Sequence, residues 1–162
     1  MLSLINSRRS VRKFKADPVS ASDLKEILEA AMNAPSAMNE QAWHFIILTG
    51  EPYTRFLDIN RNTPKGAPVG ILICGDLKES RDDYHVQDCS AATQNILLAA
   101  HARGLGSVWT TVFPDARSAV ARLLNLPEHI VPFSCTPIGW PATTRSSPTS
   151  RYDEGKVHYN TW

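Results

Sequence analysis

Residues 34–45 read Ala34-Pro35-Ser36-Ala37-Met38-Asn39-Glu40-Gln41-Ala42-Trp43-His44-Phe45, and they join two segments with different apolar patterns. Before them, apolar residues at helical spacing follow a run of capping residues, which predicts a helix over 22–33 that ends ahead of Pro35. After them, the apolar run 45–48 favours a buried strand. Polar side chains in such a turn either bind a ligand or satisfy the turn's own hydrogen bonds, and the sequence leaves both possibilities open.

The rest of the chain continues this alternation of helices and strands. Its patterns predict helices over 53–59, 88–102 and 116–124, and strands over 69–74, 107–112 and 133–138. The chain has no internal repeats, and 162 residues are enough for one hydrophobic core. We therefore expect a single α+β or α/β domain over residues 1–162.

The C-terminal part has a different composition. Residues 141–152 are rich in Ser, Thr and Pro, which favours an extended arm over a packed element. The last six residues, 157–162, turn apolar again and need a surface against which to pack. The arm and its tail suggest a partner subunit.

Composition narrows the classes of partner. The 17 basic and 16 acidic side chains give a net charge of +1, so no overall field draws the chain to nucleic acid or an anionic membrane. No apolar run approaches the roughly 20 residues of a membrane span. The three cysteines are widely spaced and the five histidines lack ligand spacing, which argues against disulfides and a metal site. We expect a cytoplasmic protein without metal, nucleic-acid or membrane partners.

A basic segment near the N-terminus is the second candidate binding site. Residues 7–14 read Ser7-Arg8-Arg9-Ser10-Val11-Arg12-Lys13-Phe14. Guanidinium groups beside a hydroxyl can hold a phosphate by bidentate and charge-assisted hydrogen bonds. A solvated basic face and a nucleic-acid-binding arm are the alternatives, and the near-neutral net charge weakens the second.

The order and spacing of these two segments closely resemble the FMN-dependent nitroreductase family, in its short single-domain form. Further similar segments extend over nearly the full chain: 67–68, 71–76, 87–92, 104–109, 138–141 and 157–160. Two positions depart from the family pattern. Ala42 stands where the family commonly has proline, and Thr149 stands where larger members place a lysine before the C-terminal arginine.

This resemblance implies an α+β two-layer sandwich with a mixed central β-sheet. It also implies a homodimer in which the C-terminal arm, about residues 141–162, is swapped onto the partner subunit, with two tightly bound FMN molecules at the interface. One subunit would hold the phosphate with Arg8 and Arg151, and the phosphate or ribityl chain with Arg9 and Ser10. Arg12, together with Lys65, would face the N1–C2=O edge of the flavin.

The remaining implied flavin contacts come from three other segments. The resemblance implies that the turn after residue 34 of the second subunit closes over the ribityl chain and ring through Pro35, Ser36 and Asn39. Asn62 and Lys65 resemble an Asn-x-x-Lys motif whose two residues contact the flavin ring in larger members. Backbone groups near flavin N5 and O4 would come from Thr110, Thr111 and Val112. These residues position the flavin, and no side chain is expected to act as a catalytic acid or base because the cofactor carries the chemistry.

The implied activity is transfer of a hydride from NAD(P)H through flavin N5 to a nitroaromatic, quinone or similar acceptor. A cation at the N1–C2=O edge favours the anionic, two-electron-reduced flavin, so a ping-pong two-electron mechanism is expected. The chain has no dinucleotide fingerprint, so the sequence does not distinguish NADH from NADPH. Alternatives are another superfamily chemistry, either a reductive dehalogenase or a flavin-cleaving enzyme, and a non-catalytic flavin-binding module.

Overall fold

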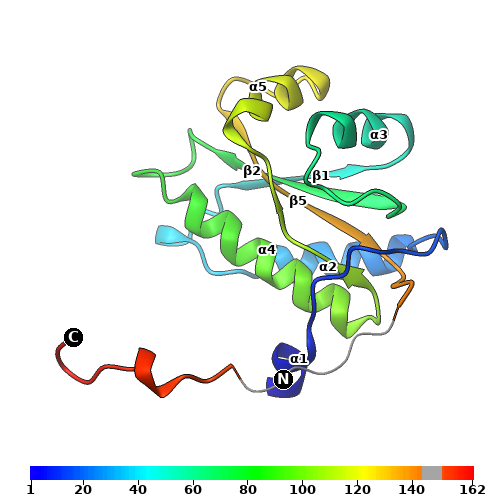
Figure 1. Ribbon diagram of the computed structural model, residues 1–162. Coiled ribbons are helices and arrows are strands. Elements are labelled where there is room, and N and C mark those ends of the chain that lie inside the picture. Colours follow the sequence, from blue (N-terminus) through cyan, green and yellow to red (C-terminus); the bar gives the residue numbers. More distant parts are fainter. Residues whose placement is uncertain (144–150) are drawn as a thin grey trace.

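The computed structural model describes residues 1–143 and 151–162, and within them one sheet crosses the middle of the molecule (Figure 1). Its strands lie in the order β1-β2-β5-β3, and β4 also pairs with β5. They are β1 (Trp43–Leu48), β2 (Val69–Asp76), β3 (Gly106–Ser107), β4 (Thr110–Thr111) and β5 (Ile130–Gly139). β3 and β4 keep one register on β5, so they form the single strand predicted over 107–112 with an interruption after Ser107.

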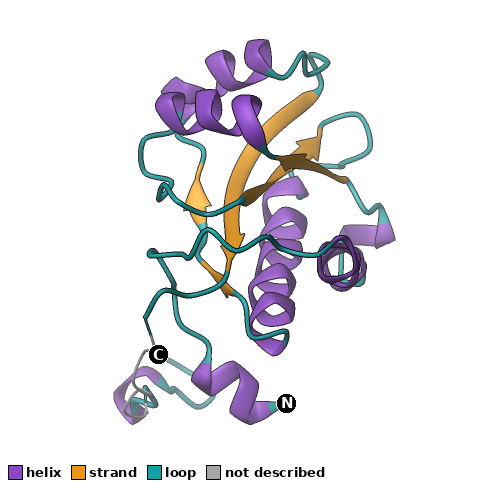
Figure 2. Cartoon of the chain, turned by 90° about the vertical axis from the view of Figure 1, so that its right-hand side faces the viewer, coloured by secondary structure: helices purple, strands orange, loops and turns teal. Residues whose placement is uncertain are grey.

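Helices cover both faces of this sheet, as Figures 1 and 2 show from two directions. The helices and short turns are α1 (Leu2–Ser7), α2 (Ala21–Met32), η1 (Ala37–Asn39), α3 (Gly50–Ile59), α4 (His85–Ala102), α5 (Pro114–Leu123) and η2 (Glu154–Lys156). α2 and α4 lie on one face, and α3 and α5 lie on the other. The four long helices lie where the apolar spacing predicted them, whereas α1 was not predicted. None of the helices in the described residues is both long and apolar enough to cross a membrane.

β2 explains why one sheet can support two helical layers. All eight of its residues are buried, and successive side chains of a strand point to opposite faces. Ile71 and Ile73 pack with Ile96 of α4, while Leu72 packs with Phe56 of α3 on the opposite face. Each such side chain contributes about 1.5–3 kcal/mol when it leaves water. The apolar run 69–74 therefore forms the centre of two cores.

The α+β class predicted for the chain is confirmed, but two details of the expected architecture are wrong. The sandwich has three layers instead of two. The strand pairs of the described residues are antiparallel, so the sheet is not mixed there, and parallel pairing is limited to a bridge between Ser10 and Ser107. An apolar run predicts burial on both faces, but it does not set the direction of the strand.

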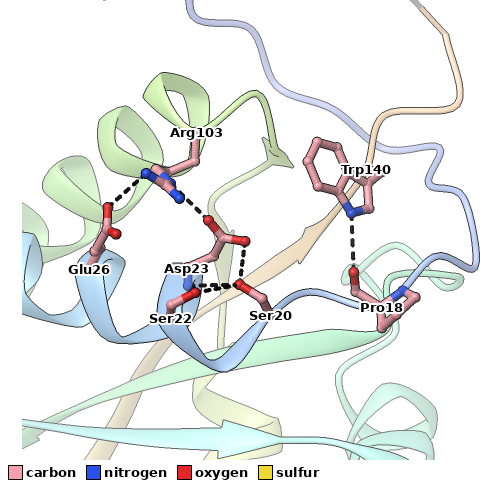
Figure 3. A network of polar contacts seen from close by, with 7 residues as sticks. All are labelled: Pro18, Ser20, Ser22, Asp23, Glu26, Arg103 and Trp140. Atoms are coloured by element: carbon pink, nitrogen blue, oxygen red, sulfur yellow. Dashed lines mark hydrogen bonds and ion pairs between the residues drawn. The ribbon is translucent and has the colours of Figure 1, made fainter.

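Contacts at its first turn hold α2 in a fixed position relative to α4 (Figure 3). Ser20 caps the helix, because its Oγ accepts the backbone N–H of Asp23 at 3.0 Å. Arg103, directly after α4, donates to Asp23 at 2.8 Å and lies 3.1 Å from Glu26. Trp140 Nε1 donates to the carbonyl oxygen of Pro18 at 3.1 Å. These contacts fix the helix that leads into the turn after residue 34.

The C-terminal segment 151–162 extends away from the sheet on the side of α1 (Figure 1). Every residue in it is exposed, including Tyr159 at 80% and Trp162 at 100%. Its position agrees with the predicted arm, and packing on a partner stays a prediction. The part of the arm that contains Thr149 lies outside the described residues.

Candidate functional site

The guanidinium of Arg8 is partly buried and has no counter-charge in the described residues. Its Nη1 is buried and has no hydrogen-bond partner in the described residues. Burial lowers the pKa of Arg8, and the charges of Arg9 and Arg151 lower it further. No ion pair in the described part of the chain involves any of these three arginines. Since arginine stays protonated, this arrangement is unfavourable until an anion such as phosphate satisfies it.

The segment that carries Arg8 is held against the edge of the sheet. Ser10 bridges Ser107, and the N–H of Val11 donates to the Ser107 carbonyl at 2.8 Å. Arg9 turns back onto the chain, where its Nη2 donates to the Asn6 carbonyl at 2.9 Å and its Nη1 to the Arg8 carbonyl. Arg12 is exposed, and it has no side-chain hydrogen bond or ion pair within residues 1–143 and 151–162. Arg12 thus keeps its donors for a ligand.

His101, near the end of α4, lies beside the arginine cluster. Its Nε2 lies 2.8 Å from the Oγ of Ser7. Burial lowers the pKa of His101, and the charges of Arg8 and Arg9 lower it further, so the ring stays neutral at pH 7. Sequence patterns do not predict this contact, because they indicate only an ordinary core or surface histidine at position 101.

A polar network holds the predicted segment 110–112. The carbonyl oxygen of Thr111 accepts the side-chain amides of Asn62 at 3.0 Å and Asn60 at 3.2 Å. The hydroxyl of Thr110 donates to the Cys135 carbonyl at 2.6 Å and lies 2.9 Å from the hydroxyl of Thr63. Asn60 and Thr63 are buried and were not among the predicted site residues, although they belong to the same polar run as Asn62.

Two of the predicted contact groups are already engaged within the chain. Lys65 lies 3.0 Å from Asp58 in an exposed ion pair. The N–H of Val112 donates to the Phe133 carbonyl at 3.0 Å, and the Val112 side chain is fully buried. Within the segment 110–112, the exposed residue is Thr111.

The turn after α2 has unusual backbone geometry. Met38, Asn39 and Gln41 have φ values of 49°, 58° and 54°, in the left-handed region. Such residues cost about 1–3 kcal/mol each and cluster at functional sites. Ser36 Oγ accepts the N–H of Gln41 at 3.0 Å, and the Gln41 side chain donates to Asn39 at 3.2 Å. Pro35 and Asn39 are exposed, so the turn presents a shaped polar surface.

One chain does not bring this turn to the arginine cluster. The N–H of Ala37 donates to Asp88 near the beginning of α4, whereas Ser7 meets His101 near its end. Asp88 and His101 are 13 residues apart, so these two contacts lie about 20 Å apart along the helix. Figure 1 shows α1 near one end of α4 and the turn near the other. The structure thus gathers Arg8, Arg9, Ser10 and Arg151, and leaves Pro35, Ser36 and Asn39 apart from them.

Comparison with known proteins shows which protein family this chain resembles. The model of the nitroreductase family matches residues 5–61 and 51–140. A protein of Methanothermobacter thermautotrophicus, provisionally named NADH dehydrogenase/NAD(P)H nitroreductase, is 41% identical over 100% of this chain and 87% of its own. The iodotyrosine deiodinase of Thermotoga neapolitana is 30% identical over 98% of this chain and 97% of its own.

Solved structures show the same fold. An FMN-dependent nitroreductase from Clostridium difficile R20291 has a TM-score of 0.92 and 28% identity over 100% of both chains. A nitroreductase-like protein from Desulfovibrio desulfuricans, solved in complex with FMN, has a TM-score of 0.89 and 30% identity over 99% of this chain and 96% of its own. From the family match and the 41% identical relative, together with this shared architecture, the chain belongs to the nitroreductase family.

Proposed function

We propose that this NAD(P)H-dependent flavin oxidoreductase passes electron pairs from NAD(P)H, through bound FMN, to a nitroaromatic, quinone or similar acceptor. The observation that carries the proposal is the buried Nη1 of Arg8, which has no hydrogen-bond partner within residues 1–143 and 151–162 and feels the charges of Arg9 and Arg151. Three guanidinium groups without a carboxylate partner in the described residues fit a phosphate dianion. The names of the nitroreductase relatives and the FMN complex of a similar protein support this choice of cofactor.

The chain's own residues hold and orient the flavin. Arg8 and Arg151 would hold the phosphate, and Ser10 would bind the phosphate or the ribityl chain. Arg9 would add positive charge, while its guanidinium group donates to the backbone. Arg12 brings positive charge to the N1–C2=O edge. FMN, when bound, supplies the hydride chemistry, so no side-chain acid or base is required. Asn62, Thr110 and Thr111 would contact the flavin ring, and their hydrogen bonds hold this segment in place.

We extend the proposal to a homodimer with two sites. The turn of Pro35, Ser36 and Asn39 lies about 20 Å along α4 from the arginine cluster, so a second copy would supply it to each site. The exposed apolar side chains of the arm, including Tyr159 and Trp162, favour packing on that copy. Both substrates would react in turn at the same bound flavin, which gives ping-pong kinetics.

Two measurements on the purified protein test the proposal. Fluorescence titration of the apoprotein should show that FMN binds much more tightly than riboflavin, which lacks the phosphate. Steady-state assays with NADH or NADPH and a nitroaromatic or quinone should give parallel double-reciprocal lines. Equal affinity for FMN and riboflavin would contradict the phosphate site, and intersecting lines would contradict the ping-pong sequence.

Reductive dehalogenation is a second candidate, favoured by the 30% identical deiodinase. That alignment runs over 189 positions against 162 residues here, so the deiodinase carries segments that this chain lacks. An assay with iodotyrosine and a nitroaromatic under the same reductant separates the two activities. We expect turnover of the nitroaromatic, and faster turnover of iodotyrosine would favour the alternative.

A further inference from the structure

We infer that Asp88 is a positioning residue for flavin binding, because its carboxylate fixes the turn that covers the FMN held by the partner subunit. The inference rests on the proposed function, which supplies the flavin and the second copy. It adds a residue outside the turn and outside the arginine cluster. Asp88 acts through the backbone of Ala37, between Ser36 and Asn39.

The contact is a buried, charge-assisted hydrogen bond between distant parts of the chain. The N–H of Ala37 donates to Asp88 Oδ1 at 2.9 Å, across 51 positions of sequence. Asp88 is only 2% exposed. Its second oxygen, Oδ2, is buried and has no hydrogen-bond partner in the described residues. The hydrogen bond that the Asp88 carboxylate makes in the described residues therefore goes to the turn.

The turn needs an external anchor because its own backbone is strained. Left-handed φ values at Met38, Asn39 and Gln41 make the observed conformation costly for a free loop. The bond from Gln41 to Ser36 closes the turn on itself, and it does not tie the turn to the body. A second tie joins Glu40 to Arg81, whose backbone N–H donates to Glu40 Oε2 at 2.9 Å. The ion pair between the two side chains contributes little, because the Arg81 side chain is exposed.

The side chain at position 88 can be varied so that the hydrogen bond is either kept or lost. Asp88→Asn keeps an oxygen that can accept the Ala37 N–H, whereas Asp88→Ala removes it. Ala37→Pro removes the donor instead and leaves Asp88 intact. Ala37 begins η1 and Ser36 has extended φ and ψ of −136° and 155°, so proline fits there. Ser90→Ala is the control, because the Ser90 hydroxyl bonds to Val86 within α4.

The experiment measures two properties of each variant. Hydrogen exchange of the Ala37 amide in the apoprotein reports the turn, and titration with FMN reports the site. We expect Asp88→Ala to expose the Ala37 amide and to weaken FMN binding about tenfold or more, as loss of a hydrogen bond to a charged group does. Ala37→Pro should weaken FMN binding to a similar extent. Asp88→Asn should stay near the wild type, and Ser90→Ala should match it.

Each contrary result would overturn a different part of the inference. Wild-type FMN affinity in Asp88→Ala or Ala37→Pro would overturn the positioning role while the proposed function stands. An equal loss in Asp88→Asn and Asp88→Ala would overturn the hydrogen bond as the cause. Failure of the wild-type protein to bind FMN would overturn the proposed function, and the flavin role of Asp88 with it. If Asp88→Ala does not fold, Ala37→Pro and Asp88→Asn still decide the question.

Discussion

At the scale of single residues, Arg8 is the side chain whose chemistry depends most on a ligand. Its Nη1 is buried without a partner in the described residues, and two neighbouring arginines repel it. Removal of this charge relieves the apoprotein and deprives the phosphate of a donor. The same substitution therefore has opposite effects on folding and on binding.

We predict that Arg8→Ala weakens FMN binding about tenfold to a hundredfold, because hydrogen bonds to charged groups contribute about 1.5–3 kcal/mol. Riboflavin affinity should be unchanged, and the free energy of unfolding of the apoprotein should stay equal or rise. Flavin fluorescence and urea denaturation measure these quantities. Arg55→Ala, which loses an exposed pair with Glu51, is the control. A normal preference for FMN over riboflavin in Arg8→Ala would remove Arg8 from the phosphate site.

Asp76, at the end of β2, gives a prediction of pH dependence. Burial opposes its ionisation, but N–H groups of Lys78 and Glu79, a hydrogen bond from His44 and the charge of His129 outweigh this, so its pKa is lowered. A lowered folded-state pKa stabilises the protein fully above the unfolded-state value near 4, and this contribution is lost as the pH falls through the folded-state pKa. The protein should therefore lose stability in acid.

The measurement is urea denaturation between pH 5 and pH 3. We expect the free energy of unfolding of the wild type to fall as the pH decreases, and to fall less in Asp76→Asn. Asp17→Asn is the control, because Asp17 is exposed. Equal slopes in the wild type and Asp76→Asn would show that another group causes the acid sensitivity.

At the scale of elements, the site depends on close contact between the arginine segment and β3. A Cβ at Gly106 would lie 2.7 Å from a methyl group of Val11, which sits between Ser10 and Arg12. We predict that Gly106→Ala pushes this segment from the sheet and weakens FMN binding about tenfold or more, a loss comparable to that of one charged hydrogen bond. The double variant Gly106→Ala/Val11→Gly restores the space, since the Cβ of Val11 itself would lie only 2.8 Å from the new methyl group. FMN titration should therefore show recovery in the double variant, and no recovery would mean that Val11 is not the cause.

Sequence patterns predicted elements better than they predicted contacts between them. The cap at Ser20 and the apolar spacing that follows predicted α2 within a residue at either end. The run at 69–74 predicted a buried strand, but not its antiparallel direction, because burial does not depend on direction. Asp88 could not be found as a site residue, since its partner Ala37 is 51 positions away and becomes its neighbour only in the fold.

At the scale of the whole molecule, the proposed flavin site requires two copies of the chain. Truncation after Asp153 keeps Arg151 and removes the exposed apolar tail that contains Tyr159 and Trp162. We predict that the truncated protein dissociates into monomers at concentrations where the full chain is a dimer, and that FMN binding becomes concentration-dependent. Analytical ultracentrifugation with detection of flavin absorbance measures both. A dimer with unchanged flavin content after truncation would contradict the role of the tail.

One chain brings together only some of the residues that the sequence predicted for the flavin site. Arg8 and Arg151, 143 positions apart, lie close enough for their charges to interact, which the family resemblance implied and composition did not. The burial of Arg8 Nη1 was not predicted, because it follows from packing around α1 and α4. The assignment of Pro35, Ser36 and Asn39 to the same flavin remains a prediction about two chains.

The proposed function requires that this chain binds FMN and reduces it with NAD(P)H. Its most direct test is the visible absorption spectrum of the FMN-reconstituted protein during anaerobic titration with NADH and with NADPH. We predict that the flavin band is lost with at least one of the two, without the absorption of a one-electron-reduced flavin. A protein that binds no FMN, or one whose flavin stays oxidised with both nucleotides, would contradict the account.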